Sequence, residues 1–368
     1  MRILYLINAG IMGGRERHVM TLVKSLPKVI QYCVCAVSAG EATDKMFAEG
    51  LNVRVLGGRN GHDFRIVPRF VRLLREFKPD IIHAHSAALI PYFILKFFPR
   101  IALVQSIHGP SVSGAEWAAR RKSLAWKVKG WLAGLMQRRP DYCLPVSQST
   151  WDEFKSVYPW ARGEVFFNAL NLDALPKSNE DRKQAGTKIV GMVGRMADQK
   201  DWPSFVEIAR LVLAKMPDVE FWGVGASEEW ARANIAGDIG CVKWFGTRQD
   251  ARELLSNMDV FVMTSKHEQL PTTMLEAFAL KVPVVGFLPE GGTDEILALA
   301  RNCDAALMIK DRDCSKVAEL VINVLADSVL YDKIVQEGYR VVTEHFDMRK
   351  RCATQLMDVY KRLVAKET

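Results

Sequence analysis

Short apolar runs alternate with amphipathic segments along most of the chain. Each run is rich in Val, Ile, Leu or Phe and is bounded by polar or glycine-rich residues, so it predicts a buried strand. The clearest runs lie at residues 2–7, 32–37, 53–56, 102–107, 188–193, 219–225, 242–246, 260–263 and 282–287. Strands that alternate with helices in this way are typical of parallel sheets covered by helices on both faces. The sequence therefore predicts the α/β class.

A chain of 368 residues is long for a single core and suits two domains of ordinary size. The polar stretch at 176–186, PKSNEDRKQAG, interrupts the alternation and is typical of a connection between domains. We expect a first Rossmann-like domain over residues 1–172 and a second over residues 173–345.

Two glutamates lie in a strand–loop–helix–strand segment at residues 265–292, SKHEQLPTTMLEAFALKVPVVGFLPEGG. Glu268 is in the loop, and Glu276 follows eight positions later, inside the first turns of the helix. Thr273 stands three residues before Glu276, which is a capping-box pattern. A helix N-terminus suits a phosphate, and carboxylates on either side of it suit hydroxyl groups. The segment predicts a pocket for a sugar–diphosphate–ribose; the alternative is that Glu276 only caps the helix and Glu268 is solvated.

Two cations follow the predicted strand at residues 188–193. Arg195 comes directly after Gly194, and Lys200 precedes the next helix. Ligands of such sheets bind beyond the carboxyl ends of the strands, where both cations are expected. An arginine binds phosphate through two N–H groups and a lysine adds a point charge, so the pair suits a departing diphosphate. The alternative is a pair of surface cations.

The first predicted domain carries glycines and histidines at the ends of its strands. Gly13 and Gly14 follow the first strand and let the backbone approach a ligand closely, although a plain tight turn has the same pattern. His108 follows the strand at 102–107 and is well placed for a functional role. His85, at the end of the preceding strand, is interpreted as a packed side chain.

The chain resembles the retaining glycosyltransferases of family 4, which have the GT-B fold. The resemblance covers nearly the whole chain and rests on the E-x7-E pair with EAFALKVPVV at 276–285, on GGRERHV at 13–19 and on VKWFGTRQDARELLSNMDVFVMTS at 242–265. It implies two Rossmann-like domains facing a central cleft. It also implies that a C-terminal helix at 346–368 crosses back and packs on the first domain.

The resemblance implies roles for individual residues. In the family, the second glutamate of the pair holds the ribose and the first contacts the donor sugar. The implied catalytic residues are His108, Arg195, Lys200 and Glu268. The implied donor-binding residues are Gly13, Gly14, Gln269, Leu270, Pro271, Thr272 and Glu276. This sequence departs from the family pattern at Ala169, Asp201 and Gln269, where the family usually has glycine; a side chain at 269 bears on the choice of donor sugar.

The implied activity is transfer of a sugar from a nucleoside diphosphate to an acceptor hydroxyl with retained anomeric configuration. The implied enzyme class is a hexosyltransferase. A UDP-sugar is favoured over a GDP-sugar, and the acceptor is expected to be a glycan or lipid-linked glycan of cell-surface polysaccharide or lipopolysaccharide synthesis. No cofactor or metal is expected, because protein cations serve the diphosphate. The alternatives are a nucleotide-sugar epimerase or a glycogen-synthase-like polymerase, and a non-catalytic nucleotide- or glycan-binding protein.

The charge of the chain bears on its partners. The net charge of +8 suggests an anionic partner. Lys and Arg lie beside aromatic residues at 92–100 and 120–131, which suits an anionic membrane surface; a buried helix with a solvated basic face is the alternative. No nucleic-acid-binding motif accompanies the charge, so nucleic acid is not expected as a partner.

The cysteines and the apolar runs bear on location. The seven cysteines are odd in number and widely scattered, which is typical of reduced thiols in the cytosol. The first apolar run is too short for a signal peptide, and no stretch reaches the roughly 20 apolar residues of a spanning helix. We expect a cytoplasmic protein with peripheral contact to the cytoplasmic face of the inner membrane.

Overall fold

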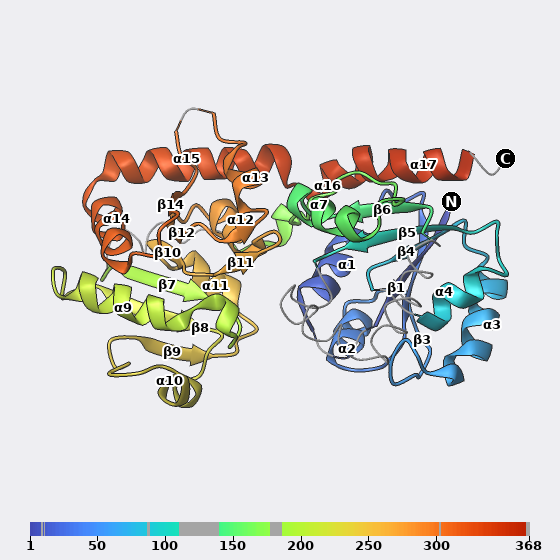
Figure 1. Cartoon of the computed structure of the whole chain (residues 1–368), viewed down its shortest axis with the longest axis horizontal. Helices are drawn as coiled ribbons and strands as arrows, with labels where there is room; N and C mark the ends of the chain where they lie inside the picture. The colour runs from blue at the N-terminus through green and yellow to red at the C-terminus, as the bar shows by residue number, and fades with distance from the viewer. Residues whose placement is uncertain are drawn as a thin grey trace. The chain divides into compact units, whose positions relative to one another are not determined.

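The computed structural model describes residues 1–8, 10, 12–86, 89–109, 140–176, 186–301 and 303–365. The chain forms two compact units (Figure 1): unit 1 is Met1–Asn168 with Met348–Thr368, and unit 2 is Ala169–Asp347. The unit boundaries lie after Asn168 and Asp347, whereas the sequence analysis placed them after residues 172 and 345. Each unit contains one parallel six-stranded sheet packed by helices, so the predicted α/β class with two sheets is confirmed.

The sheet of unit 1 has the strand order β3-β2-β1-β4-β5-β6, with every neighbouring pair parallel. The central strand β1 pairs with β2 on one side and with β4 on the other, where Ile3 lies opposite Ile81. The strands are β1 (Arg2–Ile7), β2 (Gln31–Ala36), β3 (Val53–Val55), β4 (Ile81–Ala84), β5 (Ala102–Ile107) and β6 (Tyr142–Pro145). In β1, β4 and β5 every side chain except that of Arg2 is buried, as expected of strands covered on both faces.

Helices pack against this sheet and complete its core. Phe70 of α3 and Tyr92 of α4 are fully buried in the cluster of apolar side chains around β1, β2 and β4. The helices of the first part of unit 1 are α1 (Gly14–Ser25), α2 (Glu41–Ala48), α3 (Val67–Phe77), α4 (Leu89–Leu95) and α7 (Gln148–Val157).

The C-terminal segment returns to unit 1, as the sequence predicted. It consists of α16 (Met348–Arg351), a π-helical turn (Cys352–Leu356) and α17 (Met357–Ala365). Tyr360 of α17 is fully buried, and its hydroxyl oxygen lies 3.2 Å from that of Tyr5 on β1. Gln355 donates a hydrogen bond of 2.7 Å to the carbonyl oxygen of Val165. The last helix is therefore part of the core of unit 1.

The sheet of unit 2 has the strand order β14-β12-β10-β7-β8-β9, again parallel throughout. Its strands are β7 (Ile189–Val193), β8 (Glu220–Val224), β9 (Lys243–Gly246), β10 (Val260–Met263), β12 (Val284–Phe287) and β14 (Leu307–Ile309). A second, two-stranded parallel sheet is formed by β11 (His267–Glu268) and β13 (Glu290–Gly291). β11 precedes α12 (Thr272–Ala279) in the chain and β13 follows β12, so the small sheet joins the segments on either side of this helix. Glu268, which was expected in a loop, is the last residue of β11.

The helices of unit 2 bury their apolar faces against this sheet. Trp202, Phe205 and Phe221 are among the largest fully buried side chains of the core. The helices are α9 (Trp202–Leu213), α10 (Glu228–Asn234), α11 (Ala251–Ser256), α12 (Thr272–Ala279), α13 (Thr293–Leu297), α14 (Cys314–Ala326) and α15 (Ser328–His345).

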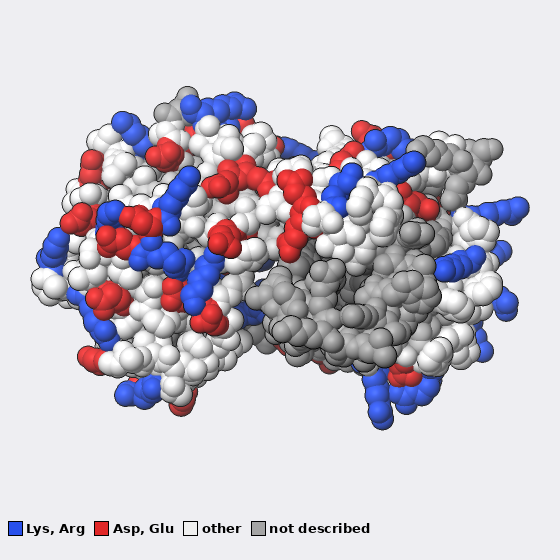
Figure 2. Space-filling model, viewed as in Figure 1, with Lys and Arg blue, Asp and Glu red and all other residues white. Residues whose placement is uncertain are grey.

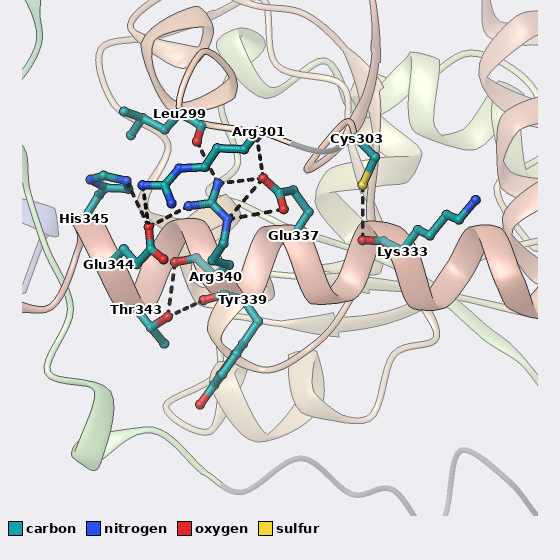
Figure 3. A network of polar contacts seen from close by, with 10 residues as sticks. All are labelled: Leu299, Arg301, Cys303, Lys333, Glu337, Tyr339, Arg340, Thr343, Glu344 and His345. Atoms are coloured by element: carbon teal, nitrogen blue, oxygen red, sulfur yellow. Dashed lines mark hydrogen bonds and ion pairs between the residues drawn. The ribbon is translucent and has the colours of Figure 1, made fainter.

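A charged network anchors α15 to the loop that follows α13 (Figure 3). The buried carboxylate of Glu337 accepts a 2.6 Å hydrogen bond from the backbone N–H of Arg301 and another of 2.6 Å from the guanidinium of Arg340. Arg340 also donates to the carbonyl oxygen of Leu299 at 2.8 Å and to Glu344 at 2.6 Å. The buried carboxylate of Glu337 is thus both paired and hydrogen-bonded, which is the condition for burying a charge.

The helix α15 supports α12 by close packing. A Cβ atom at Gly338 of α15 would come within 2.8 Å of the ring of Phe278 on α12, so the glycine permits this approach. The buried face of α12 carries Met274, Leu275 and Phe278. The charged network therefore holds the helix on which α12 rests.

None of the described helices is both long enough and apolar enough to cross a membrane.

Candidate functional site

A small pocket lies at the carboxyl edge of the unit-2 sheet, beside the start of α12. Its cavity volume is about 60 Å³, which leaves room for a small group such as a phosphate. It is lined by Met192, Val193, Lys200, Glu268 and the residues at 261–265 and 270–273. The structure therefore brings together the predicted site residues Lys200, Glu268, Leu270, Pro271 and Thr272.

Lys200 and Glu268 form an ion pair in the wall of this pocket. Lys200 Nζ lies 2.5 Å from Glu268 Oε1, and the two side chains are only 15% and 12% exposed. Lys200 comes from the 3-10 turn η3 (Asp198–Lys200), and Glu268 comes from β11. A Cβ atom at Gly194 would lie 3.2 Å from the lysine side chain, so the glycine leaves room for it. Neither charge is a solvated surface group. The alternatives of a solvated Glu268 and of Lys200 as a surface cation therefore do not hold.

The backbone of Glu268 is held by the small sheet. Glu268 lies opposite Gly291 in the pairing of β11 with β13, and its carbonyl oxygen accepts a 3.0 Å hydrogen bond from the N–H of Gly292. Gly291 has a φ of 118°, and a Cβ atom there would lie 2.0 Å from the Glu268 carbonyl oxygen. Glycine is therefore required at 291 for the backbones to approach closely enough to fix Glu268.

Asp201 follows Lys200 at a position where the family usually has glycine. Its backbone has the left-handed conformation that glycine adopts most easily. Its φ is 52° and its ψ 56°, a region that Asp tolerates better than most residues. Its carboxylate accepts hydrogen bonds from Ser204 Oγ at 2.8 Å and from Arg312 Nη2 at 2.5 Å. Arg312 also donates to the carbonyl oxygen of Thr264 at 2.5 Å and so ties the turn after Lys200 to the loop after β10. Nothing in the sequence around Arg312 predicted this role.

The N-terminus of α12 opens onto the pocket. The helix begins at Thr272 after Pro271, and no described side chain caps it. The capping-box prediction was wrong, because Thr273 is the second residue of the helix and not its cap. The first N–H groups of a helix have no partner within the helix and carry a partial positive charge, so this end suits a phosphate.

Glu276 forms an ion pair with Arg252 of α11. Arg252 Nε and Nη2 lie 2.8 and 2.7 Å from Glu276 Oε1, and the side chains are 33% and 16% exposed. The interpretation that Glu276 only caps the helix is therefore wrong. Arg252 was missed by the sequence analysis, since nothing in its own segment indicates a partner 24 residues away. Glu276 lies about one helical turn beyond the pocket-lining residues of α12.

Gln269, the predicted donor-binding residue that replaces a glycine, contacts its own loop. Its Nε2 lies 2.7 Å from Nε2 of His267. The carbonyl oxygen of His267 accepts a 2.5 Å hydrogen bond from Gln199. These contacts join the loop before α12 to the turn that carries Lys200.

Arg195 is the predicted cation that the structure does not bring into the pocket. Its side chain is exposed and is not among the lining residues. Its carbonyl oxygen accepts a 3.1 Å hydrogen bond from Trp202 Nε1, which fixes its backbone. A role on a diphosphate would require the side chain to turn toward the pocket.

In unit 1, Gly13 and Gly14 begin α1. Gly13 is the N-cap with a φ of −119°, and its N–H donates to Glu16 Oε2 at 3.2 Å. A Cβ atom at Gly14 would meet no described atom within 4 Å. The fold itself therefore does not demand glycine at 14, and close approach of a ligand remains the reason to expect one.

His108 belongs to a cluster of four histidine rings in unit 1. His108 Nε2 lies 3.1 Å from His85 Nδ1, and the two rings are stacked with centroids 5.4 Å apart. His83 lies on the other side of His85, with ring centroids 4.3 Å apart. His18 of α1 contacts both His85 and His108. The interpretation of His85 as a packed side chain is confirmed, whereas the cluster as a whole was not predicted.

Burial keeps these rings neutral. It lowers the pKa of His18 to about 4 and that of His83 to about 3. Burial, followed by the charges of the neighbouring histidines, also holds the pKa values of His85 and His108 well below the usual range. Among the described residues, no group of three or more His, Cys, Asp or Glu side chains is arranged to hold a metal ion.

Two family models match the chain. Residues 12–174 match the model described as glycosyltransferase family 4, and residues 187–327 match the model described as glycosyl transferases group 1. The two matches together extend over most of both units.

Curated relatives are similar to parts of the chain. It is 28% identical over 49% of its length to a lipopolysaccharide core biosynthesis glycosyltransferase of Rhizobium meliloti. It is 28% identical over 64% of its length to a GDP-mannose-dependent alpha-mannosyltransferase of Mycolicibacterium smegmatis. The matches span only 51% and 62% of these two relatives. An Escherichia coli galactosyltransferase named for UDP-Gal and a diphosphoundecaprenol acceptor is 24% identical over 82% of the chain and 80% of its own length.

Solved structures show the same fold over the whole chain. Anabaena HepE in complex with UDP has a TM-score of 0.77 at 18% identity, covering 98% of this chain and all of that one. A sucrose-phosphate synthase from Thermosynechococcus elongatus has a TM-score of 0.71 at 16% identity, covering 99% of both chains.

Proposed function

Because this chain belongs to the family 4 glycosyltransferases and has their two-domain GT-B fold, we propose that it transfers a sugar from a nucleoside diphosphate to an acceptor hydroxyl with retained anomeric configuration. The observation that carries the proposal is the largely shielded Lys200–Glu268 pair in a phosphate-sized pocket at the start of α12. A sugar diphosphate can be bound here by three groups that lie together. The lysine and the uncapped helix N-terminus suit the phosphates, and the carboxylate suits the sugar hydroxyls.

The diphosphate binds at the pocket in this proposal. The N–H groups at the start of α12, around Leu270 to Thr273, and the ammonium group of Lys200 neutralise the charge that develops as the diphosphate leaves. Lys200 then exchanges its carboxylate partner for a phosphate oxygen, and the exposed Arg195 turns in to add a second cation. With these protein cations on the leaving group, the reaction is expected to need no metal ion.

The remaining predicted residues serve the two ends of the donor. Glu276 accepts hydrogen bonds from the ribose hydroxyls, and Glu268 orients the donor sugar once Lys200 has moved to the phosphate. Gln269 limits the space around that sugar, since it extends from the same loop. In unit 1, Gly13 and Gly14 let the start of α1 approach the ligand, and His108 serves the transferring sugar and the incoming hydroxyl.

We propose a uridine donor and a glycan or lipid-linked glycan acceptor of cell-surface polysaccharide or lipopolysaccharide synthesis. The relative named for UDP-Gal aligns with 82% of this chain, and its named acceptor is a lipid diphosphate. Two other relatives are named for GDP-mannose, so the donor base must be tested directly.

The deciding experiment is a thermal-shift series with UDP, GDP, their sugars and a chelator. A ligand that binds only the folded state stabilises it by about 2.7 kcal/mol at a concentration of 100 times Kd. We expect UDP to raise Tm in the presence of chelator and Glu276→Ala to abolish the shift. A shift by GDP alone would overturn the uridine proposal, and a shift that needs metal would overturn metal independence. If no nucleotide raises Tm of the folded protein, the assignment of the site is wrong.

Turnover separates the enzyme from its alternatives. Release of UDP from a UDP-sugar that depends on an added glycan or lipid-linked acceptor supports transfer. Conversion of the donor to its epimer without an acceptor would indicate an epimerase. Binding of UDP without turnover on any acceptor of these classes would indicate a non-catalytic binding protein.

We also propose peripheral contact with an anionic membrane, at the cytoplasmic face of the inner membrane. Phe93 and Phe97 of the segment at 92–100 are 52% and 70% exposed, and their rings contact each other 5.7 Å apart. Lys96 and Arg100 are exposed beside them. Figure 2 shows Lys and Arg side chains projecting around the end of unit 1 that carries α3 and α4. Exposed aromatic rings among cations suit an anionic lipid surface; the second predicted segment, at 120–131, lies outside the described residues.

Sedimentation with vesicles tests the membrane proposal. We expect binding to phosphatidylglycerol vesicles at low salt, and weaker binding by the double variant Phe93→Ser and Phe97→Ser. Val29→Ser, which alters an apolar side chain that is 80% exposed elsewhere on unit 1, is the matched control. Failure of the protein to sediment with anionic vesicles would remove the proposal.

A further inference from the structure

The half-buried His108 ring makes one described hydrogen bond, and its partner is another histidine. His108 Nε2 and His85 Nδ1 lie 3.1 Å apart. His85 is 2% exposed and is packed between His83 and His108, with Tyr5 and His18 also in ring contact. The position of the His108 ring is therefore set by a side chain that has almost no freedom of its own.

His83, on which His85 rests, is held at both ring nitrogens. Its Nδ1 lies 2.6 Å from the hydroxyl oxygen of Tyr360 on α17, and its Nε2 lies 2.8 Å from Ser106 Oγ on β5. Its side chain is fully buried. A ring held at both nitrogens has little freedom to move, and His85 packs against it with the two rings tilted by 31°. The C-terminal helix therefore contributes to the support of His85.

Two neutral imidazoles joined by one hydrogen bond share one proton between the facing nitrogens. Either His85 Nδ1 donates to His108 Nε2, or His108 Nε2 donates to His85 Nδ1. In the second arrangement the other proton of the pair would sit on His85 Nε2, which is buried and has no hydrogen-bond partner among the described residues. Buried N–H donors without an acceptor are rare in folded proteins. The first arrangement avoids one, because His85 Nε2 then carries only a lone pair.

We infer that His85 is a positioning residue for His108: by donating from Nδ1 to His108 Nε2, it holds that ring with its proton on Nδ1. His108 can then act toward a substrate only as an N–H donor from Nδ1, not as an acceptor at that atom. The inference rests on the proposed function for the role of His108, but the tautomer itself is a property of the folded chain. A fixed donor suits a sugar hydroxyl or a leaving oxygen that gains negative charge.

The tautomer is measured directly by NMR on protein carrying ¹⁵N-labelled histidine. The chain has seven histidines, and His108→Ala and His85→Phe assign the two resonances of interest. We expect His108 in the native protein to be protonated at Nδ1 and bare at Nε2 near neutral pH. His85→Phe keeps a ring in the stack but has no donor, and it should release His108 into a mixture of tautomers. His85→Asn retains an N–H donor near the same place and should restore the single form.

His18→Phe is the matched control for the NMR measurement. It makes the same substitution in the same cluster, where His18 contacts His85 and His108 through its ring without a described hydrogen bond to either. The tautomer of His108 should therefore be unchanged in His18→Phe. A change equal to that in His85→Phe would mean that ring packing, not the hydrogen bond, selects the tautomer, and it would overturn the inference.

Activity provides the second readout. Loss of a group that orients a catalytic imidazole costs on the order of 10- to 100-fold or more in turnover. We expect His85→Phe to lower kcat by that factor with the Kd for UDP unchanged, and His85→Asn to recover most of it. A native His108 protonated at Nε2, or a His108 tautomer that survives His85→Phe, would overturn the inference. If the tautomers behave as expected but no acceptor is ever glycosylated, the proposed function fails and the positioning role stands.

Discussion

The ammonium group of Lys200 lies 2.5 Å from the carboxylate of Glu268, in a pocket where both side chains are largely shielded from water. Each of the two groups would interact with a different part of a sugar diphosphate, the lysine with phosphate and the glutamate with hydroxyls. In the free protein they satisfy each other. In the proposed function, donor binding would exchange this ion pair for two sets of contacts, so that neither charge is left unpaired in the pocket.

Lys200→Met tests this exchange. The variant nearly keeps the length of the side chain but removes the cation that we propose neutralises the leaving diphosphate, and it leaves the carboxylate of Glu268 without its partner in the pocket. Loss of one group that stabilises developing charge costs about 10²- to 10³-fold in kcat. We expect a loss of that size together with weaker UDP binding, measured by steady-state kinetics and calorimetry.

Lys266→Met is the matched control for Lys200. Lys266 lies near the pocket in the same unit, but its ion pair with Asp198 at 3.0 Å is on the surface, with side chains 45% and 94% exposed. Exposed pairs contribute little, so this variant should retain near-normal turnover. Equal losses in the two variants would show that net charge, and not the position of Lys200, matters.

Arg252→Ala tests how far Glu276 depends on its partner. Arg252 holds the Glu276 carboxylate through Nε and Nη2, at 2.8 and 2.7 Å from the same oxygen. Without it the glutamate must be ordered by the ribose, and immobilising one long side chain costs about 0.5–1.5 kcal/mol. We expect the Kd for UDP to rise about two- to tenfold in calorimetry.

Arg248→Ala provides the comparison for Arg252. Arg248 pairs with Asp250 on the surface just before α11 and makes no described contact with Glu276. Its loss should leave the Kd unchanged. An unchanged Kd in Arg252→Ala as well would mean that Glu276 is ordered without the arginine.

The two sheets could be predicted from the sequence because strands buried on both faces must be apolar at nearly every position. β1, β5 and β10 are of this kind. The edge strand β14 (Leu307–Ile309) was not predicted, since it is short and only half-buried. The strand order could not be predicted from local pattern either, because hydrogen bonds between parallel strands have no local sequence signal.

In the unit-2 site, Lys200 and Glu268 could be predicted because each follows the end of a predicted strand in the sequence. The arginines that order the site could not. Arg252 and Arg312 reach partners 24 and 47 or more residues away, and a contact at that separation depends on the completed fold. The histidine cluster was missed for the same reason, although the two histidines at the end of β4 were a partial signal.

Glu337→Leu should destabilise unit 2. Glu337 is buried, and it satisfies both the backbone N–H of Arg301 and the guanidinium of Arg340 (Figure 3). Removing the carboxylate leaves the N–H of Arg301 without its hydrogen-bond acceptor, and a buried donor that loses its partner costs about 1–3 kcal/mol. Glu344 still pairs with Arg340, so we expect the lower end of this range. Native-state hydrogen exchange of amides in α15 and α12 measures the loss.

Glu344→Leu is the control on the same helix. It removes another carboxylate partner of Arg340, but this side chain is 39% exposed and water can replace it. The protection of the α12 amides from hydrogen exchange should then be almost unchanged. Equal loss in the two variants would indicate that burial of Glu337 adds nothing to the pair.

The histidine cluster should make unit 1 sensitive to acid. The pKa of His18 is lowered to about 4 and that of His83 to about 3, from an ordinary value of 6.5. Below pH 6.5 the unfolded chain therefore binds protons that the folded chain does not. Each ring removes about 1.4 kcal/mol of stability per pH unit, from about 6.5 down to about 4 for His18 and about 3 for His83.

Unfolding of unit 1 as a function of pH checks this, with amide exchange in β1 and β4 as the probe. His18→Phe removes one titrating ring. Between pH 6.5 and 4, the unfolded chain should then take up about one proton fewer on unfolding, and the free energy of unfolding should depend less steeply on pH. A dependence that is the same in both proteins would show that His18 is protonated in the folded state.

Unit 1 is discontinuous in the sequence, whereas unit 2 is one continuous segment. Tyr360, whose hydroxyl contacts Tyr5 and His83, lies in the final segment, Met348–Thr368. A ribosome therefore releases all of unit 2 before it releases the residue that closes the core of unit 1. Domains generally complete their folding in the order in which they are synthesised. Here that order is reversed: the nascent chain can finish its second unit while its first unit still waits for its last helix.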